Sequence, residues 1–155
     1  MSRAFVHDAE ETEGLEELPD RLISAHPNYV TKEGLKKIEA EVARLSEEYA
    51  AAQRAADRQL IANVGRDLRY WTARRDSAEV VAPPPGHEEV HFGMRVTVKR
   101  SDGRKHTYRI VGEDEADPSH GSIPYVSPLA KALMGRRVGD VVHVGDGDAE
   151  ILKIA

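Results

Sequence analysis

The sequence lacks cysteine altogether and has few aromatic residues: two Phe, five Tyr and one Trp among 155 residues. Without cysteine the chain cannot form disulfides or zinc sites with thiolate ligands. So few rings argue against a large aromatic-lined core or pocket. No apolar run reaches the roughly 18 residues of a membrane span, so we expect no membrane association. The first residues lack the basic start and apolar stretch of a signal peptide, so a cytoplasmic location is expected.

Charge is abundant but unevenly placed, although the net charge is only −5. Residues 8–20 contain seven Asp or Glu and no Lys or Arg, whereas residues 53–75 contain six Arg against two Asp. Because apolar residues near the start are few and unpatterned, we expect residues 1–26 to form a disordered acidic tail. Such a tail either keeps the protein soluble or shields the basic segment as a mimic of nucleic acid.

Two apolar stripes with helical spacing occupy residues 27–82, and Thr31 is a predicted N-cap before the first. The first stripe contains Leu35, Ile38, Val42, Leu45, Tyr49 and Ala52. The second contains Leu60 or Ile61, Val64, Leu68, Trp71 or Thr72, Arg75 and Ala78, and runs on to about residue 82. Neither narrow stripe can be buried alone, so the pattern predicts an antiparallel helical hairpin. Its turn is expected near Asp57–Gln59, with Gly65 as the weaker alternative.

Three consecutive prolines in residues 83–88 predict a stiff extended linker. From residue 89 the apolar pattern alternates, which indicates a small antiparallel sheet domain over residues 89–155. Strands are expected at Phe92–Arg100, His106–Val111, Val141–Val144 and Ala149–Ile154. One short helix is expected after Ser127, a good N-cap, because Pro128 suits the first helical position. The predicted fold class is therefore α+β, a helical hairpin followed by a small β domain.

Three stretches of the sequence, G-E-D-E-A-D, S-P-L-A-K-A-L-M-G and V-G-D-V-V, resemble the C-terminal domain of the GreA/GreB family of bacterial transcription elongation factors. T-K-E-G-L-K-K-I-E-A-E-V and R-D-L-R-Y-W-T-A-R-R-D-S-A-E-V-V resemble the opening and closing turns of the family's helical arm. The resemblance covers roughly residues 27–155 and implies an FKBP-like fold for residues 89–155. Between the two arm matches, the sequence lacks a substantial piece of the family's arm. Its build is similar to that of the regulator of nucleoside diphosphate kinase.

The resemblance implies RNA polymerase as the partner, with RNA or DNA contacted through the polymerase complex. In the family, the C-terminal domain docks on a coiled coil at the rim of the polymerase's secondary channel, and the factor has no chemistry of its own. Acidic residues at the tip of the family's arm help to hold a catalytic magnesium, so that the polymerase cuts its own backtracked RNA. The implied polymerase-binding residues of this sequence are Asp114, Asp117, Ser127, Pro128 and Leu129.

The tip of the arm is poor in carboxylates. The resemblance places Arg54, Asp57, Arg58 and Asn63 at the tip, and Leu60 stands where the family has a Glu. Because carboxylate oxygens are the protein ligands of Mg²⁺, we expect no metal or other cofactor. We expect binding at the secondary channel with reduced or absent stimulation of transcript cleavage. The arginines either meet RNA phosphates or form a solvated helix face.

Three other functions remain open. An active transcript-cleavage factor would require Asp57 to suffice as the tip carboxylate. An FKBP-type prolyl isomerase would require an aromatic pocket, for which residues 89–155 supply only Phe92, Tyr108 and Tyr125. A coiled-coil adaptor would not bind RNA polymerase, so co-purification with the polymerase separates it from the favoured function.

Overall fold

The computed structural model describes residues 18–145 and 147–155, which fall into two compact units. The hairpin unit contains residues 18–25 and Ile38–Ser77, and the C-terminal unit contains His26–Lys37 and Ala78–Ala155. Most of the predicted acidic tail, residues 1–17, lies outside the described residues. Residues 26–37 thus belong with the C-terminal unit, although the sequence suggested that 27–82 would form one arm.

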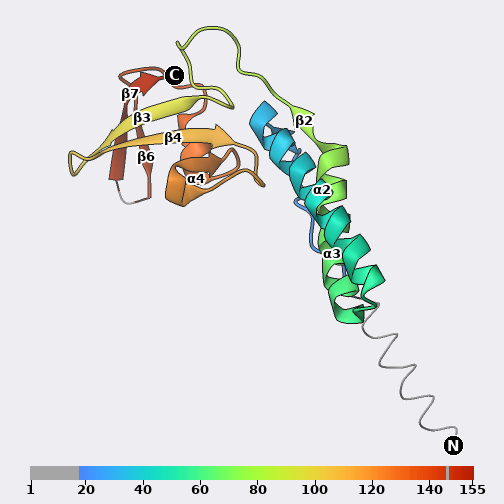
Figure 1. The fold of residues 1–155 in the computed structure, drawn as a ribbon. Coiled ribbons are helices and arrows are strands. Elements are labelled where there is room, and N and C mark those ends of the chain that lie inside the picture. Colours follow the sequence, from blue (N-terminus) through green and yellow to red (C-terminus); the bar gives the residue numbers. More distant parts are fainter. Residues whose placement is uncertain (1–17, 146) are drawn as a thin grey trace, which may run out of the picture. The chain divides into compact units, whose positions relative to one another are not determined.

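Helices α2 (Lys32–Arg54) and α3 (Arg58–Ser77) form the predicted helical hairpin (Figure 1). Thr31 caps α2 as predicted, because its Oγ1 accepts a hydrogen bond from the backbone N of Gly34 at 3.0 Å. The buried hydrophobic residues of α2 all come from the first apolar stripe: Ile38, Val42, Leu45 and Ala52. Within the described part of the chain, neither helix nor any other is long and apolar enough to cross a membrane.

The hairpin turns at residues 55–57, slightly earlier than the predicted Asp57–Gln59. Ala56 adopts the left-handed conformation (φ 51°) that glycine normally supplies, so no glycine marks the turn. Gly65, the weaker predicted turn, lies inside α3 and is buried. Of the two predicted alternatives at the start of the second stripe, Ile61 is half-buried, whereas Leu60 is 44% exposed.

The entry and exit of the hairpin are joined in the C-terminal unit by two very short parallel strands. Strand β1 (Tyr29–Val30) pairs with β2 (Glu79–Val80), so α3 ends before the predicted limit near residue 82. The ring of Tyr29 lies 6.4 Å from that of Phe92 and 5.4 Å from that of Tyr125, measured between centroids. The Tyr125 hydroxyl donates a hydrogen bond to the carbonyl of Pro27 at 2.5 Å.

A five-stranded sheet with the order β5-β4-β3-β7-β6 builds the rest of the C-terminal unit. Its strands are β3 (Arg95–Arg100), β4 (Lys105–Val111), β5 (Ser122–Pro124), β6 (Val141–Val144) and β7 (Gly147–Ile154). The four long strands were predicted, and β5 was missed because three residues show no alternation. Strand β5 pairs with β4 in parallel, so the sheet is mixed and not wholly antiparallel as expected. The short helix η1 (Pro118–His120) precedes β5.

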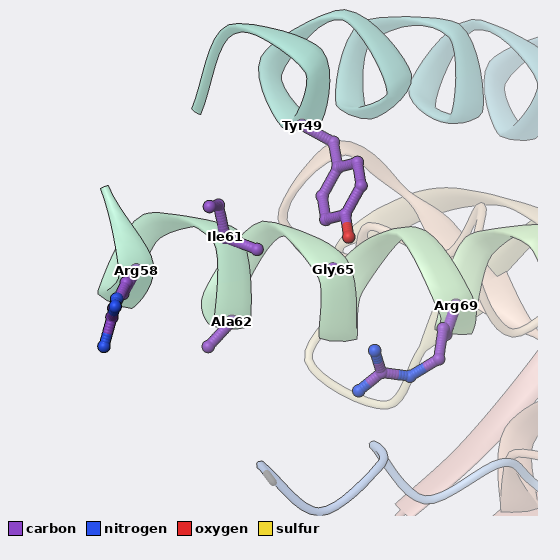
Figure 2. Close-up of a pocket in the computed structure, with 6 residues that line it drawn as sticks. All are labelled: Tyr49, Arg58, Ile61, Ala62, Gly65 and Arg69. Atoms are coloured by element: carbon purple, nitrogen blue, oxygen red, sulfur yellow. The ribbon is translucent and has the colours of Figure 1, made fainter. Parts of the chain in front are cut away.

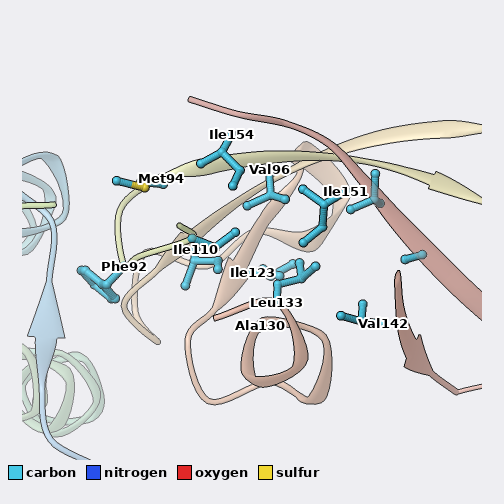
Figure 3. Packing of buried hydrophobic residues seen from close by; sticks show 13 residues of the cluster. Phe92, Met94, Val96, Ile110, Ile123, Ala130, Leu133, Val142, Ile151 and Ile154 are labelled. Carbon is cyan, nitrogen blue, oxygen red and sulfur yellow. The ribbon is translucent and has the colours of Figure 1, made fainter. Parts of the chain in front are cut away.

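Helix α4 (Pro128–Leu133) packs on the sheet and contributes Ala130 and Leu133 to the core of this unit. Figure 3 shows Ala130 and Leu133 of α4 among the inward-facing side chains of the sheet. The core residues with no exposed surface include Val96, Val98, Ile110, Ile151 and Leu133. The single helix on one face of the sheet is the predicted arrangement, and its burial fixes the position of the loops on either side of it.

Candidate partner surface and hairpin tip

The start of α4 is capped and partly open to solvent. Ser127 is the N-cap, since its Oγ accepts a hydrogen bond from the backbone N of Ala130 at 3.2 Å. Pro128 is exposed at the first helical position, whereas Leu129 is half-buried and packs against the core. Of these three predicted binding residues, Pro128 therefore has the most accessible side chain, and the other two hold it in place.

The acidic loop, residues 113–117, does not present all its carboxylates to solvent. Glu115 points inward: its side chain is 6% exposed, and its Oε2 accepts a hydrogen bond from Thr31 Oγ1 at 2.5 Å. Gly34 permits this approach, because a Cβ at that position would lie 2.5 Å from Glu115 Oε2. Glu115 thus sits at the N-terminal end of α2, where free backbone N–H groups favour a negative charge. Glu115 was not among the residues predicted from the sequence. The one signal that could have indicated a close contact here is Gly34, a glycine in the first turn of α2.

Arg109 of β4 completes a polar network at this end of α2. Its Nη2 lies 3.2 Å from Glu33 Oε2, its Nη1 lies 3.9 Å from Glu115 Oε1, and its Nε donates to the carbonyl of Gly93 at 3.2 Å. The pKa of Glu33 is lowered by a hydrogen bond from the backbone N–H of Glu33 itself and by the contact with Arg109. These contacts lie within the C-terminal unit and fix the conformation of the acidic loop from inside.

Asp117 is exposed, but its carboxylate is already engaged in a turn. Oδ1 accepts a hydrogen bond from Ser119 Oγ at 2.6 Å, and His120 Nδ1 lies 2.6 Å from Oδ2. The hydrogen bond from Ser119, which has the larger effect, and the contact with His120 hold the pKa of Asp117 below its ordinary value. The three side chains do not form a nucleophilic triad, because Ser119 Oγ lies 3.1 Å from the same ring nitrogen that faces Asp117.

The hairpin tip is held by paired backbone hydrogen bonds around Ala56. Its N donates to the carbonyl of Gln53, and the N of Asp57 donates to the carbonyl of Ala52, both at 3.1 Å. This pairing is a Schellman motif, with Ala56 in the position that glycine usually holds. Asp57 then begins α3, since its Oδ1 accepts a hydrogen bond from the backbone N of Leu60 at 3.1 Å. The carboxylate at the tip is therefore an N-cap.

The predicted tip residues Arg54, Asp57, Arg58 and Asn63 are all exposed and lie at or near the turn. Leu60, 44% exposed, lies among them. Residues 18–145 and 147–155 contain no group of three or more His, Cys, Asp or Glu that could hold a metal ion. The tip thus combines two cationic side chains with one capping carboxylate.

Residues 85–155 match the family model described as transcription elongation factor GreA/GreB, C-terminal. GreA of Acidiphilium cryptum is 35% identical over 149 residues, which cover 81% of this chain and 95% of the relative. GreB of Neisseria meningitidis serogroup A is 39% identical over 92 residues, 57% of this chain and 56% of the relative, so the matched part spans about half of that protein. The solved structure of GreA factor homolog 1 (Gfh1) of Thermus thermophilus is 19% identical, with a TM-score of 0.42, over 84% of this chain and 99% of that chain.

Proposed function

The chain belongs to the GreA/GreB family of transcription elongation factors, and on this premise we propose that it regulates elongation by binding RNA polymerase at the secondary channel. Its stimulation of transcript cleavage is reduced or absent. The polymerase supplies any chemistry, and the protein acts in the cytoplasm. One observation carries the proposal. The carboxylate at the tip of this chain's hairpin, that of Asp57, serves as a helix cap.

The binding surface for the polymerase consists of Asp114, Asp117, Ser127, Pro128 and Leu129. Its support is that these residues lie on backbone that is already fixed in the free protein. Ser127 is held by its capping hydrogen bond, Asp117 by its turn, and Leu129 by the core. A preformed surface loses little conformational entropy on binding, which favours affinity.

A short arm is the first reason to expect weak cleavage stimulation. Helices α2 and α3 have 23 and 20 residues, roughly 34 and 30 Å at 1.5 Å per residue. The alignment with the A. cryptum GreA spans 149 residues, but 81% of the 155 residues here is only about 126, so about 23 positions have no counterpart. Residues 85–155 already match the C-terminal family model, so we assign the missing positions to the arm. Divided between two helices, they shorten its reach by about 17 Å.

The chemistry of the tip is the second reason. Mg²⁺ is held by carboxylate oxygens, and Asp57 uses Oδ1 to cap α3. The alkyl side chain of Leu60 cannot coordinate a metal. Arg54 and Arg58 add positive charge at the same end of the hairpin, which disfavours a divalent cation there.

A cleavage assay on a stalled, backtracked polymerase complex tests this proposal. We expect the wild-type protein to bind the complex without shortening the RNA 3′ end. Leu60→Glu alone should not restore cleavage, because the arm stays short. A family member with a full-length arm serves as the positive control. Robust shortening of the RNA by the wild-type protein would contradict the proposal and establish an active cleavage factor.

The binding surface has a separate test. Pro128→Ala and Asp114→Ala should each weaken binding to RNA polymerase about tenfold, as truncation of a central contact residue typically does. Glu150→Ala is the matched control, because Glu150 is exposed on β7 and points away from the core face that α4 covers. If both test variants fold normally and bind like the control, the surface is assigned wrongly.

The prolyl isomerase alternative finds little support in the packing of the aromatic residues. Phe92 and Tyr125 pack edge to face against each other, 5.8 Å apart, and both contact Tyr29. Tyr108 stacks on His106 at 6.1 Å. The rings of residues 89–155 are therefore occupied with one another and with the β1 segment, which supports a role without catalysis.

A further inference from the structure

Positive charge in the C-terminal unit is concentrated in the hairpin formed by β3, β4 and the turn between them. Residues 95–109 contain six Lys or Arg and one Asp, so their charge is +5 in a chain whose net charge is −5. The one acidic residue, Asp102, lies in the turn, where its Oδ2 is 3.7 Å from Arg104 Nε. The cations of the two strands therefore find no carboxylate within the hairpin.

The pairing of the strands places these cations on one face of the sheet. Val96 and Val98 of β3 have no exposed surface and face the core, which α4 covers (Figure 1). Because side chains alternate along a strand, the residues between them face the other way, as do their partners on the neighbouring strands. These outward residues of β3, β4 and β7 form the basic face: Arg95, Thr97, Lys99, Lys105, Thr107, Arg109 and Lys153.

Like charges lie directly opposite one another on the basic face. Lys99 is the partner of Lys105 in the register of the strands, and Arg95 is the partner of Arg109. Such pairs destabilise a sheet, because the Cβ atoms of opposite residues are only about 4.5–5.5 Å apart. This repulsion persists in the free protein, and an anion bound across a pair would relieve it.

Four of the five cations are exposed and have no ion pair among residues 18–145 and 147–155: Arg95, Lys99, Lys105 and Lys153. Glu150 of β7 is a register partner of Lys99, but within the described residues no ion pair joins the two. Arg109 differs, because it contacts both Glu33 and Glu115. The basic face thus presents four cations that no described carboxylate neutralises.

A hollow of about 460 Å³ adjoins the basic face at the Arg95 end. Arg95, Thr107 and Arg109 of the sheet line it together with Lys37 of α2. The two carboxylates that also line it are those in contact with Arg109, so Arg95 and Lys37 are the cations left for a ligand there. The hollow extends the positively charged surface from the sheet to the first turns of α2.

The arginines of α3 are less available to an external anion. Figure 2 shows Arg58 and Arg69 on α3, where they line a groove of about 280 Å³ in the hairpin unit. Arg69 Nε donates a hydrogen bond to Asp20 Oδ1 at 2.6 Å, and Arg21 Nη1 lies 3.3 Å from Asp67 Oδ1 on the same helix. An anion at Arg69 must displace a carboxylate, which the cations of the basic face do not require among the described residues.

We propose that the basic face binds the phosphate backbone of duplex DNA without sequence preference. Lys and Arg side chains that neutralise phosphates release condensed counterions, which drives binding of this kind. Outward residues of one strand repeat at about 6.8 Å and neighbouring strands lie about 4.8 Å apart, so the basic face covers roughly 13 by 10 Å. Duplex DNA carries one charge per about 1.7 Å of its axis, so several phosphates fall within that area.

The side chains of the basic face favour duplex DNA over other nucleic acids. Proteins that hold single strands stack the bases on aromatic rings, but His106 and Tyr108 stack on each other at positions of β4 that alternate with the basic face. Proteins that bind duplex RNA contact its 2′-hydroxyl groups, but the hydroxyls of Thr97 and Thr107 already bond to each other at 2.9 Å. The basic face is separate from the surface proposed for RNA polymerase and does not rest on that proposal.

Fluorescence anisotropy with a labelled DNA duplex of mixed sequence, about 24 base pairs long, tests the proposal on the full chain without RNA polymerase. If the four unpaired cations each meet one phosphate, the logarithm of the association constant should fall against the logarithm of the KCl concentration with a slope of about −3.6. Lys99→Gln with Lys105→Gln should reduce the slope to about −1.8 and weaken binding about tenfold in low salt. Lys99→Arg with Lys105→Arg should bind like wild type, because the charges remain.

Lys131→Gln with Arg136→Gln is the matched control. It removes the same charge from exposed positions in and just after α4, which covers the opposite face of the sheet. The control should bind DNA like wild type. No binding by wild type in low salt, unchanged binding by the test variant, or an equal loss in the control would refute the proposal. Tighter binding of a duplex RNA of the same sequence, or displacement of the DNA by polyglutamate of equal charge, would overturn the assignment to DNA.

Amide chemical shifts of the ¹⁵N-labelled full chain locate the contact. On addition of the same duplex we expect changes at residues 95–109 and at Lys153, and none at residues 58–77 of α3. Changes at α3 with none in the β3–β4 hairpin would overturn the proposal. Because RNA polymerase is absent from both measurements, a negative result refutes the basic face alone and does not contradict binding to the polymerase.

Discussion

Replacing Ala56 by glycine should stabilise the hairpin, which is an unusual expectation for the introduction of a glycine. Ala56 has φ 51°, and its backbone N and that of Asp57 make the two bonds of the Schellman motif. The left-handed conformation brings Cβ close to the following carbonyl oxygen, at a cost of about 1–2 kcal/mol for an L-residue. Glycine has no Cβ and adopts this conformation without the clash.

The net gain is smaller than the relief of strain. Glycine also increases the conformational entropy of the unfolded chain, which costs roughly 0.4–1 kcal/mol. The difference leaves about 0.5–1 kcal/mol in favour of Ala56→Gly. With a urea dependence of about 2 kcal/mol per M, the midpoint of unfolding should rise by roughly 0.3–0.5 M.

Urea unfolding followed by the fluorescence of Trp71 is the appropriate assay, because Trp71 is the single tryptophan and lies on α3. Ala55→Gly is the matched control. The N of Ala55 donates an ordinary helical hydrogen bond to the carbonyl of Ala51 at 3.0 Å, so glycine should destabilise there by up to about 1 kcal/mol. We therefore expect the free energy of unfolding to rise in Ala56→Gly and to fall in Ala55→Gly. Equal destabilisation by both variants would refute the left-handed turn at Ala56.

Two further predictions concern the C-terminal unit. Thr31→Val should destabilise it by roughly 1–3 kcal/mol in urea unfolding, because the cap of α2 and the donor to buried Glu115 are both lost, whereas Thr31→Ser should retain both. The folded-state pKa of Asp117 is lowered, so its contribution to stability is present above the pKa of the unfolded state and is lost as pH falls through the folded-state value. An NMR titration should give the Asp117 carboxyl a pKa below the ordinary value of 3.8, and Ser119→Ala should raise it. A carboxyl pKa that stays unchanged in Ser119→Ala would contradict the hydrogen bond.

The helical hairpin was predictable because its apolar stripes extend over many residues. In α2, six stripe residues follow one another at a spacing of three or four residues, and the cap at Thr31 adds an independent start signal. The turn was placed less accurately, because the left-handed residue there is Ala56 and not the glycine that usually marks such a turn. Gly65 was misleading for the opposite reason: it serves close packing against Tyr49 and not a turn.

The sheet was predictable in its long strands and not in its short ones. Alternation identifies β3 and β7, but β1, β2 and β5 have only two or three residues each. Their existence depends on partners that are distant in the sequence; Tyr29, for example, lies opposite Glu79. The parallel pairing of β5 with β4 likewise follows from the path of the acidic loop and η1, which no local pattern records.

The same limit applies to the candidate site. Ser127 and Pro128 carry local signals of a helix start, and the structure confirms that helix. The acidic loop contains four carboxylates in five residues, and nothing local indicates which one turns inward. Glu115 is selected by a hydrogen bond to Thr31, 84 residues earlier in the chain. The exposed residues of such a loop can be identified only after the tertiary contacts of the buried one are known.

The geometry of the tip connects hairpin length with metal chemistry. In a hairpin with no residue to spare between its helices, Asp57 both ends α2 through its backbone N and begins α3 through its carboxylate. A carboxylate that holds Mg²⁺ must direct its oxygens outward, whereas a cap directs one of them at the backbone. Because Glu or Asp at position 60 would keep the backbone N–H that donates to Asp57, adding a carboxylate there would leave Asp57 capping α3. A metal-holding tip would therefore need additional residues in the turn, so that capping and coordination fall to different side chains.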